Sequence, residues 1–287
     1  MNLPQLDGVT HRTVEARGLR FHVAEAGAGE PVVLVHGWPQ HWWMWRHVVP
    51  RLAPQARLVM IDLRGFGWSD APPGRYDKQT LADDVLAVMD ALGLERVRLM
   101  AHDWGAWSGF LACLAAPERF EAFLALGSPR PSGRPNARQL REVWRFAYQV
   151  LLGSPGLGRR LIADPRFIER TILVGAVHRE AWTPDDLRAF TAVLAEPARA
   201  RASARLYRTF LAREVARSPR RAPARPDADR RRQPRPGHPR CPARWRRARR
   251  RRRGRRGRAR LRALRARGAA GARGAARSGP LRAPLIR

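Results

Sequence analysis

Residues 97–109 read VRLMAHDWGAWSG, an apolar run that meets a carboxylate and then continues with helical spacing. The part before residue 103 is typical of a buried strand, and the part after it is typical of a helix. Positions 101–105 have the form small–x–Asp–x–small, which fits a nucleophile elbow: small residues permit a tight corner, and the central side chain is presented to solvent or substrate. The stretch therefore predicts a strand, a corner at Asp103 and a helix.

Asp103 has two interpretations. An aspartate directly before a helix is a good N-cap, because its carboxylate accepts hydrogen bonds from the first turn. At the centre of an elbow, the same carboxylate could attack an electrophile and form an ester, with no base required for that step. The segments around it favour the second interpretation, because a charged group in apolar surroundings usually has a partner or a function.

The rest of the chain predicts an α/β fold with a mainly parallel sheet. Strands that alternate with helices imply βαβ crossovers, and functional groups then gather at the carboxyl ends of the strands. His36, Asp62 and Asp103 all fall at such ends. Two strands are expected around Gly18 within 11–27, with further strands in 31–37, 57–65, 97–103 and 120–129, and helices in 41–53, 80–93 and 104–116.

The helix expected in 80–93 has Thr80 as its candidate N-cap and Gly93 as its stop signal. From about residue 131 the pattern changes to helical periods separated by Gly and Pro, which predicts an all-helical cap. We therefore expect a core in residues 1–130, a helical cap in 131–215 and a separate segment in 216–287.

The turn His36-Gly37-Trp38-Pro39 ends the strand of 31–37. The backbone N–H groups of Trp38 and Trp104 could together form an oxyanion hole. A histidine such as His36 is more often a structural residue, bonded to nearby backbone, than a base. Asp62 and Arg64 are expected to hold loops by charge-assisted hydrogen bonds.

These segments together resemble the α/β-hydrolase superfamily and, more narrowly, its epoxide hydrolase branch. The stretch HGWP matches the family's His-Gly-x-Pro, DLRGFGWSDAP its Asp-x-Arg-Gly-x-Gly-x-Ser segment, and AHDWGA its elbow, with Ala101 where glycine is usual. The resemblance covers residues 11 to about 215. It implies that Asp103 is the nucleophile, with His36, Gly37, Pro39 and His102 in supporting positions.

The resemblance also implies that two cap tyrosines, Tyr148 and Tyr207, donate hydrogen bonds to the epoxide oxygen. Asp103 would then attack an epoxide carbon, and a His–acid pair would activate the water that hydrolyses the ester. The simpler interpretation of both tyrosines is that they pack on helix faces, each with its hydroxyl reaching solvent. We favour the functional one, because two of only three tyrosines match the family's pattern.

Two other functions are open on sequence grounds. A haloalkane dehalogenase shares the Asp nucleophile and the following tryptophan but does not need the tyrosine pair. A non-catalytic, basic protein that binds nucleic acid is the alternative from a different class. A serine esterase is disfavoured, because the elbow holds Asp103.

Composition limits the remaining possibilities. The chain has 287 residues and a formal net charge of +32. Its two cysteines cannot build a disulfide framework, and no metal-ligand spacing surrounds them. We expect no metal, no cofactor, no membrane span, a cytoplasmic location and a small apolar substrate.

The last 70 residues are unusual: they hold 27 arginines and two acids, Asp227 and Asp229. The family's catalytic acid and histidine should come from this region, but no apolar run that could form a buried strand follows Leu211. His238 follows Gly237 but lies among prolines and arginines, so no catalytic histidine or acid is identified. The tail could bind polyanions non-specifically through its charge. We favour a frame change in a GC-rich gene near residues 213–221, which would leave the sixth strand as an exposed apolar edge and the protein poorly soluble.

Overall fold

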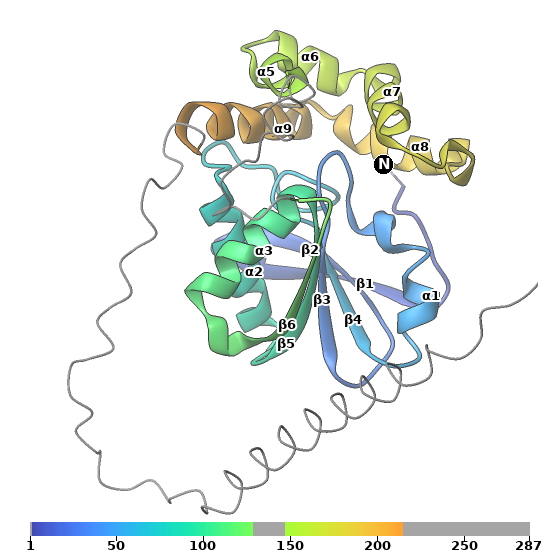
Figure 1. The fold of residues 1–287 in the computed structure, drawn as a ribbon, viewed down its shortest axis with the longest axis vertical. Coiled ribbons are helices and arrows are strands. Elements are labelled where there is room, and N and C mark those ends of the chain that lie inside the picture. Colours follow the sequence, from blue (N-terminus) through green and yellow to red (C-terminus); the bar gives the residue numbers. More distant parts are fainter. Residues whose placement is uncertain (1, 129–146, 215–287) are drawn as a thin grey trace, which may run out of the picture. The chain divides into compact units, whose positions relative to one another are not determined.

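The computed structural model describes residues 2–128 and 147–214 (Figure 1). A six-stranded sheet has the order β1-β2-β4-β3-β5-β6. The pairs β4–β3, β3–β5 and β5–β6 are parallel, while β1–β2 and β2–β4 are antiparallel, so the predicted, mainly parallel sheet is confirmed. The strands are β1 (Val9–Ala16), β2 (Leu19–Ala26), β3 (Pro31–Val35), β4 (Arg57–Ile61), β5 (Val97–His102) and β6 (Phe120–Leu126).

The central strands are apolar because both of their faces are covered. In β3, Val33 and Val35 belong to one buried cluster, while Val32 and Leu34 belong to another. Helices α2 (Lys78–Ala91) and α3 (Asp103–Ala115) cover the first face, and α1 (Val49–Leu52) lies on the opposite one (Figure 1). Strand alternation therefore sorts neighbouring side chains into two separate cores.

The single helix expected in 41–53 is wrong. The chain forms a 3₁₀ turn, η1 (Trp42–Trp45), and then the short α1. The backbone N–H of Trp42 donates to the Asp62 carboxylate at 2.7 Å, and Pro50 lies in the first turn of α1. A proline in mid-helix would break the helix, so it marks a new start instead.

The expected N-cap at Thr80 is also wrong, because α2 begins earlier. Asp77 is the N-cap, and its carboxylate accepts from the backbone N–H of Thr80 at 3.0 Å. The stop signal is placed correctly: Gly93 has a φ of +66°, a left-handed conformation that glycine adopts without strain.

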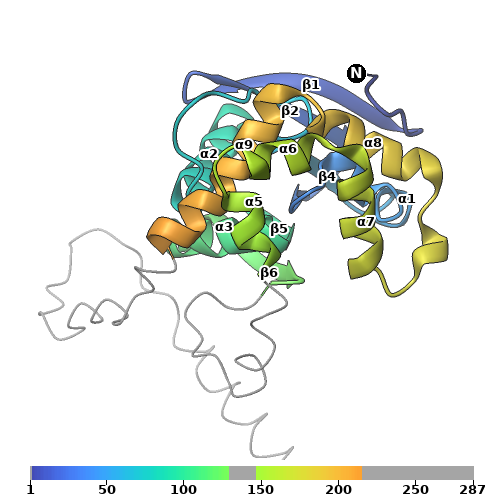
Figure 2. The ribbon, with the colours of Figure 1, turned by 90° about the horizontal axis from the view of Figure 1, so that it is seen from above.

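Five helices and two short turns of the expected cap are described. They are α5 (Tyr148–Gly153), α6 (Leu157–Ala163), α7 (Pro165–Gly175), η4 (Arg179–Ala181), α8 (Pro184–Leu194), α9 (Pro197–Thr209) and η5 (Phe210–Glu214). Figures 1 and 2 show them gathered at one end of the sheet. The first part of the expected cap, up to residue 146, lies outside the described residues.

Polar contacts tie the cap to the core. Asp186 of α8 accepts from the Trp43 indole at 3.0 Å and pairs with Arg46 at 2.7 Å. Arg199 of α9 donates to the carbonyl oxygen of Ser69 at 2.7 Å. These contacts, made from two cap helices, fix where the cap lies over the strand ends.

At the other end of the sheet order, β6 pairs with β5 alone among the described strands. Its Leu124 is 49% exposed, and Leu126 and the nearby Leu114 of α3 are exposed too. The expectation of an apolar edge is met within the described residues, while poor solubility stays a prediction. The arginine-rich segment 216–287 lies outside them, and no helix inside them is long and apolar enough to cross a membrane.

Candidate active site

Asp103 lies at a sharp corner between β5 and α3. Its φ of +50° is in the left-handed region, which residues other than glycine rarely adopt. Such backbone strain persists only where the surroundings enforce it, and it is common at functional sites. The corner has the geometry that the small–x–Asp–x–small pattern predicts.

Two glycines allow this corner to pack against the turn after β3. A Cβ on Gly37 would lie 2.5 Å from the Cβ of Asp103. A Cβ on Gly105 would lie 2.2 Å from the carbonyl oxygen of His36. Both distances are far below van der Waals contact, so only glycine fits at either position.

The Asp103 carboxylate faces the neighbouring turn. Its Oδ2 accepts a hydrogen bond from the backbone N–H of Trp38 at 3.0 Å. The N-cap position of α3 belongs to His102, which makes no side-chain cap bond, so the capping interpretation of Asp103 is wrong. The 3.0 Å hydrogen bond to the carboxylate comes from Trp38, which lies 65 positions earlier in the sequence.

Burial raises the pKa of Asp103 above its ordinary value. His102, the backbone N–H groups of Trp104 and Trp38, and the Lys78 ammonium oppose that rise, because each favours the charged form. Of the two predicted oxyanion-hole donors, the Trp38 N–H therefore bonds this carboxylate at 3.0 Å, and the Trp104 N–H favours its charged form.

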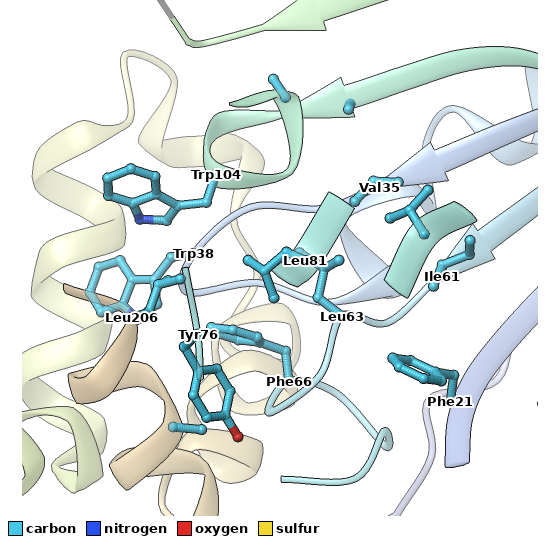
Figure 3. Close-up of a cluster of buried hydrophobic side chains, with 14 of the residues drawn as sticks. Phe21, Val35, Trp38, Ile61, Leu63, Phe66, Tyr76, Leu81, Trp104 and Leu206 are labelled. Carbon is cyan, nitrogen blue, oxygen red and sulfur yellow. The ribbon is translucent and has the colours of Figure 1, made fainter. Parts of the chain in front are cut away.

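The two cap tyrosines meet above this corner. Their ring centroids lie 6.2 Å apart, and the Tyr207 ring lies 5.2 Å from Trp38 and 5.7 Å from Trp104. Tyr207 is only 1% exposed, so the interpretation that its hydroxyl reaches solvent is wrong, whereas Tyr148 is 38% exposed. Figure 3 shows Trp38, Trp104 and Leu206, the residue of α9 before Tyr207, in one buried cluster.

The cap also contacts Trp38 through its indole, which donates to the hydroxyl of the buried Ser203 in α9. Burial raises the pKa of both tyrosines, and the nearby Asp103 charge raises it further. The hydroxyls therefore stay protonated and able to donate at neutral pH.

His36 is structural, as expected. Its Nδ1 donates to the carbonyl oxygen of Gly37 at 2.9 Å, and its Nε2 accepts from the backbone N–H of Leu63 at 3.0 Å. Both ring nitrogens are occupied, so His36 is not available as a base. Pro39, the last residue of the same turn, is buried beside it.

Asp62 and Arg64 hold loops, also as expected. The Asp62 carboxylate accepts from the backbone N–H groups of Trp42 and Trp68 and is 2.7 Å from Nδ1 of His22. Burial alone would raise the pKa of Asp62, but the bond with His22 and the nearby histidines lower it to about 2. Arg64 forms a buried ion pair with Asp84.

No histidine–carboxylate pair directed at Asp103 occurs in residues 2–128 and 147–214. The buried His22–Asp62 pair is committed to the loop contacts just described. His102 precedes the nucleophile position, and its buried Nδ1 has no hydrogen-bond partner within the described chain. His238, Asp227 and Asp229 lie outside that part, which also contains no cluster that could hold a metal ion.

Sequence reasoning missed Lys78. Its side chain is 1% exposed, and its Nζ lies 4.0 Å from the centroid of the Trp104 ring. The available signal was compositional, because Lys78 is the single lysine in a chain that otherwise uses arginine.

Comparison with known proteins identifies the family. Residues 30–236 match the model of the alpha/beta hydrolase fold. Because this match takes in well over half of the chain, the protein belongs to the α/β-hydrolase family. The match runs past residue 215, where the motif resemblance ends, into the arginine-rich segment.

Within that family the chain is epoxide hydrolase-like. It is 44% identical over 102 residues to the soluble epoxide hydrolase of Corynebacterium sp. (strain C12), covering 36% of each protein. It is 29% identical over 210 residues to epoxide hydrolase 4 of Mus musculus, covering 69% of this chain and 58% of the mouse protein. The solved structure of epoxide hydrolase CorEH without ligand matches with a TM-score of 0.64 and 30% identity, over 72% of this chain and 75% of that one.

The aligned part of this chain thus spans less than two thirds of these curated relatives. The fold and the family are shared with them, and this chain is an epoxide hydrolase-like α/β-hydrolase. What the relatives act on is carried to it only as a proposal.

Proposed function

We propose that this chain opens epoxides by direct attack of Asp103, through a covalent ester. The observation that carries the proposal is the placement of a buried tyrosine, Tyr207, against both tryptophans whose N–H groups converge on the Asp103 carboxylate. A nucleophile, an oxyanion hole and a hydroxyl donor then share one space.

In the proposed step, an Asp103 oxygen forms a bond to one epoxide carbon while the bond from that carbon to the ring oxygen breaks. The departing oxygen takes a proton from Tyr148 or Tyr207, the tyrosinate left behind regains a proton from water, and the product is a hydroxyalkyl ester of Asp103. The tyrosine hydroxyls donate to the departing oxygen and stabilise the negative charge that develops on it. This lowers the free-energy barrier of ring opening.

Hydrolysis of the ester would require a water and a base. The described residues offer no His–acid pair directed at Asp103, so we propose that the ester forms once and persists. The expected behaviour is stoichiometric labelling rather than turnover.

The test is mass spectrometry after incubation with styrene oxide. The expected result is one adduct with the mass of one reagent molecule, located on the peptide that contains Asp103. Asp103→Asn should remove it, whereas Asp90→Asn, which alters an exposed carboxylate, should not. Absence of an adduct in protein with a cooperative thermal melt would reject the proposal.

A haloalkane dehalogenase-like reaction is the competing function for the same nucleophile. It would release halide from a bromoalkane and would not depend on Tyr148 or Tyr207. Labelling by 1-bromobutane but not by styrene oxide would favour it over epoxide opening.

A further inference from the structure

Lys78, at the start of α2, is an unusual residue for a buried position. Lysine is almost never fully buried unless it is paired, because removing an ammonium from water is costly. Here the side chain is 1% exposed, and its Nζ lies 2.9 Å from Oε2 of Glu214 in η5. The Lys78 backbone N–H also donates to Oε1 of Glu214 at 2.7 Å.

The ammonium has a second partner, the aromatic face of Trp104. Its Nζ lies 4.0 Å from the Trp104 ring centroid and 4.8 Å from that of Phe210. Such cation–π contacts are strongest where water is excluded. Trp104 is the residue directly after Asp103, and its backbone N–H is one of the two that face the carboxylate.

Lys78 thus connects the core, the cap and the nucleophile corner. Burial lowers the pKa of Lys78, but Glu214, Asp103 and Asp77 oppose that shift. In turn, the Lys78 ammonium favours the charged form of Asp103, although less than His102 and the backbone N–H groups of Trp104 and Trp38 do. The other titratable groups around Asp103 are His102 of β5, Tyr148 of α5 and Tyr207 of α9.

We propose that Lys78 is a positioning residue that holds the Trp104 ring in place and keeps the Asp103 carboxylate ionised. Glu214, from the cap, partly neutralises the Lys78 charge. An attacking carboxylate must carry its negative charge, and burial works against that. A buried cation nearby offsets the burial without touching the substrate. The inference rests on the proposed function only for the role of the ionised carboxylate, since the charge effect itself is measurable without an epoxide.

The experiment is a pH titration of the aspartate carboxyl carbons by ¹³C NMR in the full-length chain, with Asp103→Asn used to assign the Asp103 signal. Lys78→Met should move the Asp103 midpoint to higher pH, and Lys78→Arg should keep it near the original value. Glu214→Gln should move it to lower pH, because a nearby negative charge is removed. The two charge changes therefore shift the midpoint in opposite directions, which a general loosening of the structure would not do.

An unchanged midpoint in Lys78→Met, or a shift of the same sign in Lys78→Met and Glu214→Gln, would overturn the proposal. Should Lys78→Met fail to fold, Glu214→Gln alone still decides, because a midpoint that stays or rises contradicts the charge coupling. The styrene oxide adduct is read separately on the unaltered chain. Loss of that adduct with opposite NMR shifts intact would reject the epoxide chemistry and leave the role of Lys78 standing.

Discussion

The α-carbon of Gly105 faces the carbonyl oxygen of His36 so closely that a Cβ there would lie 2.2 Å from it. This contact joins the first turn of α3 to the end of β3, and the corner at Asp103 depends on it. A side chain at Gly105 would push the two segments apart.

We expect Gly105→Ala to destabilise the protein by about 1–3 kcal/mol, the usual cost of overpacking a buried site. The matched control is Gly175→Ala at the end of α7, where a Cβ would meet nothing within 4 Å. That change should be neutral or stabilising, by up to about 1 kcal/mol, because alanine favours helix. Urea unfolding of both variants measures the difference, and equal effects would contradict the packing argument.

The tyrosine pair gives the second prediction. Removing one hydroxyl, in Tyr148→Phe or Tyr207→Phe, should slow adduct formation by about ten- to a hundredfold, the effect of one hydrogen bond to a charged oxygen. The double variant should be slower still. Tyr76→Phe is the control, because the Tyr76 hydroxyl donates to the Pro72 carbonyl oxygen at 2.8 Å. Single-exponential labelling rates with styrene oxide provide the readout, and a rate that falls only in Tyr76→Phe would contradict the assignment.

A third prediction concerns acid stability. Burial lowers the pKa of His41 to about 4, from an ordinary 6.5, although Asp62 and the Ala189 carbonyl oppose the shift. The unfolded chain binds a proton at this residue below pH 6.5 while the folded chain does not. The part of the folding stability that depends on neutral His41 is therefore fully present above pH 6.5 and is lost as the pH falls towards 4.

Between these two pH values, binding of this one proton should change the free energy of unfolding by about 1.4 kcal/mol per pH unit. His41→Gln should reduce the pH dependence between pH 4 and 6.5. His178→Gln should not change it, because that side chain is 79% exposed. Free energies of unfolding across this range decide, and equal slopes in His41→Gln and the unaltered chain would argue against the buried neutral histidine.

The fourth prediction concerns the coding DNA. We propose that codons 205–230 contain a frame change, because no sequence pattern for the expected acid and histidine is identified after Leu211, where the arginine-rich segment begins. Another reading frame should then encode a strand that ends in aspartate, followed later by a Gly-His pair. Sequencing the gene tests this, and an uninterrupted frame with no such segment in the others would exclude it.

Sequence patterns predicted the strands and the corner because both depend on local order. Alternation and apolar runs located β1 to β6, and the small residues around Asp103 identified the elbow. One error came partly from a contact that no local pattern contains: the Trp42 N–H bonds to Asp62 where a single helix was expected in 41–53. The other error was a choice between two local candidates, because Asp77, three positions before Thr80, is an equally suitable N-cap.

Lys78 could not be placed by periodicity. Its charged partner Glu214 lies 136 positions away in sequence, so the pair is visible only in the folded structure. The role that we propose for Tyr207 rests on resemblance, whereas its burial against Trp38 is visible only in the structure.

The bond between the Trp38 N–H and Asp103 spans 65 residues, from the end of β3 to the end of β5. It requires β3 and β5 to lie side by side, so the Asp103 corner is complete only in molecules that have formed this strand pair. Chemical labelling of Asp103 would therefore count the molecules that have completed this pairing. In a preparation prone to aggregation through β6, that count measures the natively assembled fraction directly.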